Sequence, residues 1–251
     1  GDQVAFERGF WSAFDGGTAQ HVPIDTLRAP VWSTVRRMKI GPAIESQLPL
    51  LFAATRRSLR ALSVASRDAM LRATQADLAI EELVLAFDTS RDPPTLAPLA
   101  GLPTLHTLGF HCLAEFAVRW LERADELGIR RVVLAIRPQM DYVKKILRRA
   151  KKTQIASLVI EVPAATAIRA VRDVDGTLAI HAIDLAPTHV NPREQLESAK
   201  QWLNELAAHV DPGVKVTMPT ITPALATAAD ALGLRLVAHA TSFAARPTFR
   251  A

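Results

Sequence analysis

An aliphatic triplet that recurs along residues 35–160 is the feature that most limits how this chain can fold. In each copy, apolar residues stand at positions i, i+3 and i+5, and the copies begin at residues 35, 59, 80, 105, 129 and 155. The copies are Val35, Met38, Ile40; Leu59, Leu62, Val64; Ile80, Leu83, Leu85; Leu105, Leu108, Phe110; Ile129, Val132, Leu134; and Ile155, Leu158, Ile160. A period of about 20–29 residues predicts a tandem array in which each copy supplies one strand and packs on its neighbours.

The segments between the triplets carry helical patterns. Helices are expected over residues 43–58, 69–78, 113–127 and 140–151. The second of these follows Ser66 and Asp68, either of which is a suitable N-cap, and the third ends at Gly128, a typical C-terminal residue. Five residues of Pro or Gly within 88–103 predict a loop or short 3₁₀ turns instead. Strands that alternate with helices predict an α/β protein with a parallel sheet.

Changes in this pattern divide the chain into three parts. Residues 1–34 do not follow the repeat and are expected to form an N-terminal cap with a short strand or hairpin; Trp32 is expected to close the first layer. Residues 35–162 form the regular array, and residues 163–251 form irregular C-terminal repeats and capping units. Period-two alternation on both sides of Asp175-Gly176 predicts a β-hairpin over residues 167–184. A helix from 193 to 210, strands at 214–218 and 234–238, a helix from 223 to 232 and a frayed tail from Ser242 follow.

Composition narrows the class of partner and the compartment. The 30 basic and 25 acidic residues give a net charge of +5, which is too mixed for a dedicated nucleic-acid binder. No apolar run is long enough to cross a bilayer, and the N-terminus lacks a signal-peptide pattern, so no membrane association is expected. The single Cys112 has no internal disulfide partner, which favours a reducing compartment such as the cytoplasm.

The L-x-x-L-x-L strands resemble leucine-rich repeats of the helix-bearing, ribonuclease-inhibitor-like kind over residues 35–162. Residues 6–10 and 30–40, with the late Asp175-Gly176 hairpin, are also similar to those of uncharacterised bacterial, myxobacteria-like repeat proteins in which a small N-terminal companion domain precedes the repeats. The resemblance implies a solenoid with a parallel concave sheet, helices on the convex side and an interaction role. One departure is clear: the chain has only Asn191 and Asn204, so the asparagine ladder of such repeats cannot form. Its turns must be satisfied by the backbone or by Ser, Thr and Asp.

Side chains between the core positions of each strand face away from the helices, toward the concave surface. The residues expected to line that surface and to bind a partner are Arg37, Lys39, Ser63, Glu82, Val84, Thr107, Arg131, Val133, Ser157 and Val159. The valines predict an apolar strip, which is typical of a binding surface. Two other interpretations stay open: β-branched residues are common in strands for their own sake, and the termini of the chain are able to cover the strip.

Other polar groups have a structural interpretation beside the functional one. Six cations within residues 144–152 suit phosphate or an acidic surface, but also suit a solvated helix face. His106 and His111 lack metal-ligand neighbours, His181 and His239 are expected to be ordinary strand histidines, and Cys112 is expected to be a small buried thiol. Asp173, Asp175 and Gly176 are better explained as a turn than as a calcium loop. No catalytic residue, metal or cofactor is predicted.

These observations favour a non-enzymatic scaffold or protein-interaction module that grips a protein, a peptide or another domain of its own polypeptide through the concave sheet. One alternative is a substrate-recognition subunit or regulatory domain of a larger enzyme complex. Another is an α/β-barrel enzyme, since about eight strand–helix units also suit that fold. The barrel is disfavoured because the repeat is short and no cluster of carboxylate, His or Lys side chains gathers at the carboxyl ends of the strands.

Overall fold

The computed structural model describes residues 4–7, 10–16, 22–86, 96–136, 140–162, 166–173, 175–185, 192–207, 210–218 and 221–238. The protein has a mixed α/β architecture, which confirms the predicted class. It contains two compact units. The first comprises Gly1–Cys112 and Arg119–Val132, and the second comprises Leu113–Val118 and Val133–Ala251. Helix α4 (Ala114–Glu126) and strand β7 (Arg131–Ile136) contribute residues to both. Within the described ranges, no helix combines the length and the apolar character that a membrane crossing requires.

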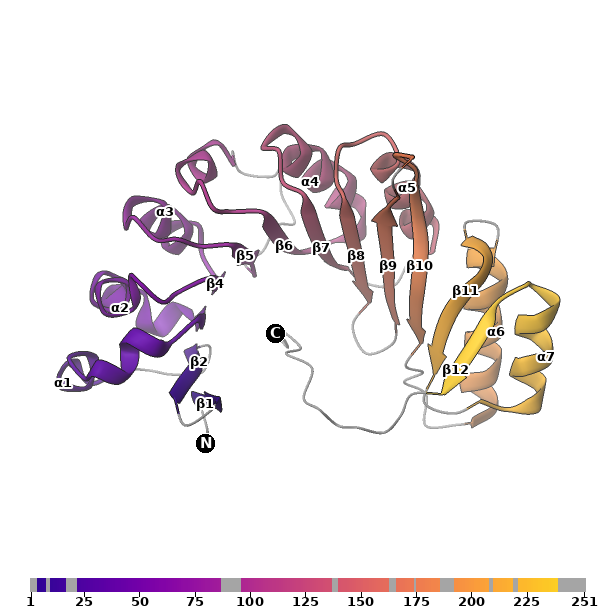
Figure 1. The fold of residues 1–251 in the computed structure, drawn as a ribbon, viewed down its shortest axis with the longest axis horizontal. Helices are drawn as coiled ribbons and strands as arrows, with labels where there is room; N and C mark the ends of the chain where they lie inside the picture. Colours follow the sequence, from indigo (N-terminus) through magenta and orange to yellow (C-terminus); the bar gives the residue numbers. More distant parts are fainter. Residues whose placement is uncertain are drawn as a thin grey trace. The chain divides into compact units, whose positions relative to one another are not determined.

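The strands of the first unit pair in the order of the chain (Figure 1). An antiparallel hairpin, β1 (Val4–Glu7) and β2 (Phe10–Gly16), comes first. The next strands, each parallel to its predecessor, are β3 (Arg37–Ile40), β4 (Ala61–Val64), β5 (Glu82–Leu85) and β6 (Thr107–Cys112). Their register places Met38, Leu62, Leu83 and Leu108 side by side. The second members of successive triplets therefore occupy equivalent positions, as the repeat predicts.

The N-terminal segment differs in one respect from the expected cap. The hairpin is present, but β2 is also parallel to β3, so it is part of the parallel array. Asp15 and Gly16, residue types that are common in turns, form the end of β2. Gly16 is needed for close packing, because a β-carbon there would meet the side chain of Ile44 and stand 2.9 Å from the carbonyl oxygen of Lys39. The predicted closure by Trp32 is confirmed: it is 2% exposed, and its ring lies edge-on to Phe14 with centroids 5.2 Å apart.

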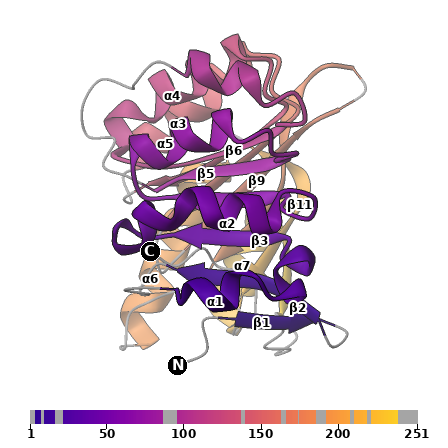
Figure 2. The ribbon, with the colours of Figure 1, turned by 90° about the vertical axis from the view of Figure 1, so that its left-hand side faces the viewer.

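The helical segments of the first unit lie on one side of its strands (Figures 1 and 2). They are α1 (Ile24–Leu27), η1 (Pro30–Thr34), η2 (Pro42–Gln47), α2 (Leu48–Thr55), α3 (Arg67–Gln75) and η3 (Ala97–Gly101). The single helix expected over residues 43–58 is instead a 3₁₀ segment followed by α2, and each begins with a proline in its first turn. A proline is tolerated there because the first N–H groups of a helix have no partner within the helix. At α3, the Ser66 hydroxyl accepts the Ala69 N–H at 3.1 Å, so Ser66 is the N-cap.

A ladder of backbone hydrogen bonds connects the starts of successive strands of the first unit. The carbonyl oxygens of Arg36, Arg60 and Glu81 each accept two N–H groups from the start of the next strand, at N···O distances of 2.7–3.1 Å. We call these bonds the entry ladder. The Thr104 hydroxyl adds a bond of 2.8 Å to the carbonyl oxygen of Ile80 in the preceding repeat. The expectation that the backbone and hydroxyl groups satisfy the turns is therefore confirmed.

The core of the first unit lies between the strands and their helices. The triplet residues Leu62, Leu83 and Leu108 are at most 1% exposed. Burial of each such side chain stabilises the fold by about 1.5–3 kcal/mol relative to exposure. Trp120 of α4 packs against Phe110 of β6 with ring centroids 4.5 Å apart, which attaches α4 to the last complete strand.

The second unit begins with antiparallel strands and ends with parallel ones. It contains β8 (Ser157–Val162), β9 (Thr166–Arg172), β10 (Leu178–Leu185), β11 (Val210–Met218) and β12 (Arg235–Ala238), with helices α5 (Met140–Ala150), α6 (Pro192–Ala207) and α7 (Pro223–Ala231). The pairs β8–β9 and β9–β10 are antiparallel, and β10–β11 and β11–β12 are parallel. The hairpin predicted over 167–184 is confirmed, with Gly176 at φ +84° in its turn. The expectations for residues 88–95, His239 and the tail from Ser242 lie outside the described residues.

One arginine fastens three segments of the second unit together. The guanidinium group of Arg172 in β9 donates to the carbonyl oxygens of Ala150 at 3.2 Å, Thr153 at 2.7 Å and Ile155 at 3.1 Å. It also donates to the carbonyl oxygen of Gly176 in the hairpin turn. The side chain therefore donates to the last carbonyl group of α5, which also accepts the N–H of Thr153, and to two carbonyl groups of the segment that follows the helix.

Candidate partner-binding face

The face of β3–β6 that points away from the helices is the candidate site, and we call it the strand face. It carries every second residue of each strand: Arg37 and Lys39, Ala61 and Ser63, Glu82 and Val84, Thr107 and Gly109. The register aligns them in two rows across the strands. One row is Arg37, Ala61, Glu82 and Thr107, and the other is Lys39, Ser63, Val84 and Gly109.

The predicted binding residues of the first unit differ in their solvent exposure. Arg37 and Arg131 are exposed, and Lys39 and Glu82 are half-buried. Ser63 and Thr107 are each only 2% exposed. Because they are short, these two side chains lie between longer neighbours and form a floor. The strand face is therefore a floor of small groups beside charged groups that reach above it.

The prediction that valines form a solvent-facing apolar strip is wrong at two positions. Val84 and Val159 are buried, with exposures of 5% and 7%. Val84 fills the space above Gly109, where a β-carbon would stand 2.9 Å from its Cγ2 atom. Val159 pairs with Arg169 on β9, whose long aliphatic stem is able to cover a neighbouring apolar group. Both valines are packed by their cross-strand neighbours, which the spacing of triplets alone does not reveal.

The remaining predicted residues, Val133, Ser157 and Val159, belong to the second unit. Val133 and Ser157 are half-buried. Three of the ten predicted residues thus belong to the second unit. The other seven belong to the first unit: Arg37, Lys39, Ser63, Glu82, Val84, Thr107 and Arg131.

Electrostatics on the strand face centre on Lys39. Its Nζ atom lies 3.9 Å from the Asp15 carboxylate on β2. Desolvation by burial lowers the pKa of His111 below 6.5, and the positive charge of Lys39 lowers it further. The neutral form of this imidazole is therefore favoured, so His111 adds a polar group without a charge at neutral pH.

Cys112 does not have the environment of a nucleophile. Desolvation by burial raises the pKa of its thiol to about 12. A reactive cysteine needs the opposite, a lowered pKa that yields thiolate at neutral pH. Cys112 was expected to be a small buried thiol; desolvation raises the pKa of its thiol accordingly, but the residue as a whole is half-buried.

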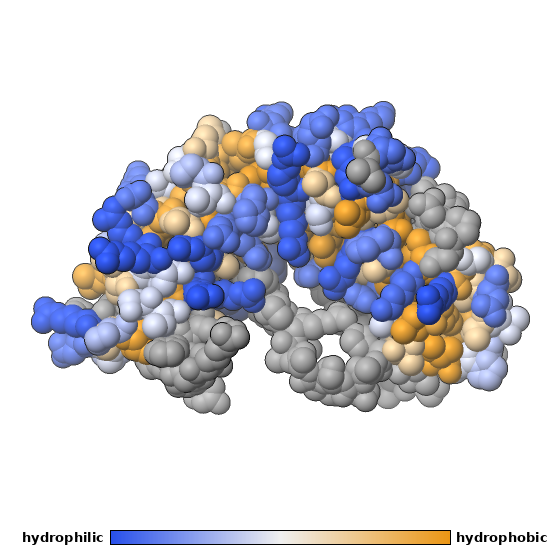
Figure 3. Space-filling view, in the orientation of Figure 1, coloured by the Kyte–Doolittle hydropathy of each residue, from blue (hydrophilic) through white to orange (hydrophobic). Residues whose placement is uncertain are grey.

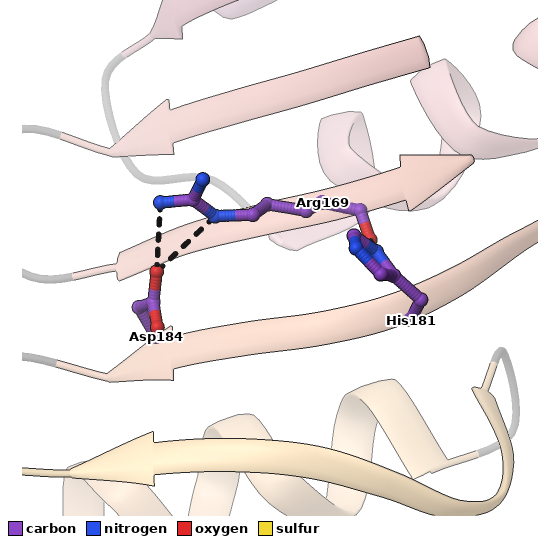
Figure 4. A network of polar contacts seen from close by, with 3 residues as sticks. All are labelled: Arg169, His181 and Asp184. Atoms are coloured by element: carbon purple, nitrogen blue, oxygen red, sulfur yellow. Dashed lines mark hydrogen bonds and ion pairs between the residues drawn. The ribbon is translucent and has the colours of Figure 1, made fainter. Parts of the chain in front are cut away.

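The second unit holds a polar network that the sequence analysis missed (Figure 4). The Arg169 guanidinium lies 3.1 Å from the Asp184 carboxylate, and the Nδ1 atom of His181 lies 3.1 Å from the carbonyl oxygen of Arg169. A β-bulge makes the ion pair possible: Ile180 pairs with Ala170 but Ala182 with Arg169, so His181 is the extra residue. Because of this one-residue shift in register, the side chain of Ile183 points into the core, where it is fully buried. The side chain of Asp184 then lies on the same face as Arg169.

The basic run of α5 is partly structural. Lys144 Nζ lies 2.5 Å from the carboxylate of Glu205 on α6, and that hydrogen bond is the main cause of the lowered pKa of Glu205. Lys145 Nζ lies 4.8 Å from the centre of the Tyr142 ring. Figure 3 shows hydrophilic residues where α5 reaches the surface, as expected for a solvated helix face.

The other candidate groups have local roles. His106 is exposed, and its Nδ1 atom lies 2.9 Å from the Thr107 hydroxyl. In the hairpin turn, the Asp175 carboxylate accepts the Thr177 N–H at 2.8 Å, as expected of a turn. Within the described ranges, no three His, Cys, Asp or Glu side chains are grouped so that they could hold a metal ion.

Comparisons with models of protein families, with curated proteins and with solved structures each found no match.

Proposed function

We propose that this protein is an interaction module that binds a protein or peptide partner on the strand face of β3–β6. The observation that carries the proposal is the composition of that face: a floor of small side chains with charged groups beside it, on the side of the strands away from the helices. Small side chains permit the backbone of a partner to come close, and charges fix which partner is accepted. This partner class includes another domain of the same polypeptide.

The pairing of consecutive parallel strands, with equivalent triplet positions in register, supports a leucine-rich-repeat-like solenoid for this array. In that architecture the strand face is the concave surface that such proteins use for binding. The single Cys112 and its unreactive thiol support work in a reducing compartment such as the cytoplasm.

A binding role is favoured over an enzymatic one. The α/β-barrel alternative requires strands that are all parallel, whereas β1–β2, β8–β9 and β9–β10 are antiparallel. The thiol of Cys112 and the neighbouring imidazole of His111 follow each other on one strand and therefore point to opposite faces, so they do not form a nucleophile–base pair. A recognition or regulatory subunit of a larger enzyme complex would use the strand face in the same way.

The test is to select binders from a random peptide library with the 251-residue chain and to map their contacts by NMR chemical-shift changes. We expect the largest changes at β3–β6. Lys39→Trp, which places a bulky group on the strand face, should weaken the selected peptides at least fivefold. Gln75→Trp, which places the same group on the exposed side of α3, should not. Selected peptides that shift only helix signals, or a library that yields no binder, would refute the proposal.

A further inference from the structure

Three charged side chains alternate in sign along the first row of the strand face. Arg37 pairs in register with Ala61, Ala61 with Glu82, and Glu82 with Thr107. The Arg131 N–H donates to the carbonyl oxygen of His106 at 2.9 Å, the same bond that aligns each earlier pair, so Arg131 stands beside Thr107. The row therefore reads positive, small, negative, small, positive across five neighbouring strands of the first unit. We call it the charge row.

The three charged groups are available to a partner. Arg37 and Arg131 are exposed and Glu82 is half-buried. Within the part of the chain that the structure describes, their charged groups take part in no ion pair and no hydrogen bond. By contrast, the Arg60 side chain in the adjacent entry ladder is paired with Glu81 at 3.4 Å. Between the members of the charge row stand two short side chains, Ala61 and Thr107, which are 7% and 2% exposed.

The spacing of the charge row selects a peptide conformation. Neighbouring strands are about 4.8 Å apart, so successive charges stand about 9.6 Å apart. A polyproline-II helix returns to the same face every three residues, after about 9.3 Å. An extended β-strand repeats a face every two residues, after about 6.8 Å, and an α-helix after one or two turns, about 5.4 or 10.8 Å. Of these, the polyproline-II repeat fits the row best.

We infer that the charge row is a docking track for a peptide segment in the polyproline-II conformation that carries acidic, basic and acidic side chains at positions i, i+3 and i+6. The acidic residues pair with Arg37 and Arg131, and the basic residue pairs with Glu82. This inference rests on the proposed function and specifies its partner. The charges supply selection and register, while the floor at Ala61 and Thr107 permits the peptide backbone to lie close.

The test uses a synthetic peptide, Glu-Pro-Pro-Lys-Pro-Pro-Glu, blocked at both ends and labelled for fluorescence anisotropy with the same chain at low salt. Two controls are Lys-Pro-Pro-Glu-Pro-Pro-Lys, with every charge reversed, and Glu-Pro-Lys-Pro-Pro-Pro-Glu, with the same composition but a different spacing. We expect the first peptide to bind at least about tenfold more tightly than either control, with the preference weakening as salt is added. Equal affinities, or no measurable binding of the first peptide, would overturn the inference.

A charge-exchanged variant makes the test specific to the row. The triple variant Arg37→Glu, Glu82→Arg, Arg131→Glu should invert the preference, so that Lys-Pro-Pro-Glu-Pro-Pro-Lys becomes the tighter ligand. The matched control, Arg36→Glu with Arg130→Glu, changes exposed arginines one residue before the row and should leave the preference unchanged. Library-selected peptides that shift β3–β6 but lack the charge pattern, and that the triple variant still binds, would refute the track and leave the proposed function standing. Peptides that bind only at the helices would refute both.

Discussion

Val84 occupies the space that Gly109 leaves on the neighbouring strand, and a β-carbon on Gly109 would stand 2.9 Å from Val84 Cγ2. The two residues pair directly in the register of β5 and β6, and Val84 is 5% exposed. Their fit explains why a glycine stands in the middle of a strand, where it would otherwise weaken the sheet.

Gly109→Ala should therefore destabilise the first unit by about 1–3 kcal/mol, the usual cost of overpacking. Urea denaturation of the variant measures this cost. Val84→Ala in the Gly109→Ala background removes the Cγ2 atom and should restore part of the loss, although Val84→Ala alone is destabilising. If the two changes add without coupling, the contact has no energetic weight.

Replacement of Arg172 should weaken the attachment of the C-terminal end of α5 to the β9–β10 hairpin. Arg172→Ala removes the guanidinium donor from the carbonyl groups of Thr153 and Ile155, whereas the carbonyl oxygen of Ala150 keeps the N–H and hydroxyl of Thr153 as donors. We expect a loss of about 1–3 kcal/mol. Arg172→Lys should restore little of it, because an ammonium group lacks the planar fork of donors. Amide hydrogen exchange in α5 and β9 measures the effect locally. Arg148→Ala, on the exposed side of α5, is the control and should change protection little.

The lowered pKa of His111 makes the free energy of unfolding depend on pH. Below pH 6.5 the unfolded chain binds a proton at this imidazole that the folded chain does not, so the free energy of unfolding falls as the pH falls through this region. Lys39→Gln removes the smaller of the two causes, so the pKa of His111 should rise but stay below 6.5 because desolvation remains. NMR titration of the imidazole signals checks both statements. An unchanged pKa in the variant would show that Lys39 does not act on His111.

The thiol of Cys112 should react slowly while the chain is folded. With its pKa raised to about 12, almost no thiolate is present at pH 8, and we expect alkylation to be at least about 100-fold slower than in the urea-unfolded chain. Above pH 9.0 the unfolded thiol ionises before the folded one, so the free energy of unfolding should fall as the pH rises from 9.0 toward 12. Cys112→Ala should remove this dependence. Equal alkylation rates in the two states would contradict the raised pKa.

The triplets predicted the strands of the first unit because burial imposes the same apolar spacing on every copy. Met38, Leu62, Leu83 and Leu108 are aligned as the repeat requires. The hairpin near Asp175-Gly176 was also predictable, since turn chemistry and alternation are local signals. The 3₁₀ segment from Pro42 to Gln47 was not, because it shares the apolar spacing of the helix that follows it.

The candidate site was predictable in outline only. Alternation assigned Arg37, Glu82 and Arg131 to the face away from the helices, and the register aligned them in a row. The burial of Val84 depends on the contact across to Gly109, which no periodicity reveals. The ion pair of Arg169 and Asp184 depends on the bulge at His181. The bulge changes the phase of the buried positions, from Ile180 to Ile183, and the hairpin prediction did not use this change.

The entry ladder has an evolutionary consequence. Because Arg36, Arg60 and Glu81 contribute only main-chain groups to it, side-chain changes at these positions should leave these hydrogen bonds in place. These bonds link segments 21–25 residues apart in the chain (36 to 60, 60 to 81, 81 to 106). In the solenoid that we propose, a whole copy could therefore be gained or lost by duplication or deletion while the bonds on either side re-form. In the proposed solenoid, the number of copies and the side chains on the strand face can therefore change independently of each other.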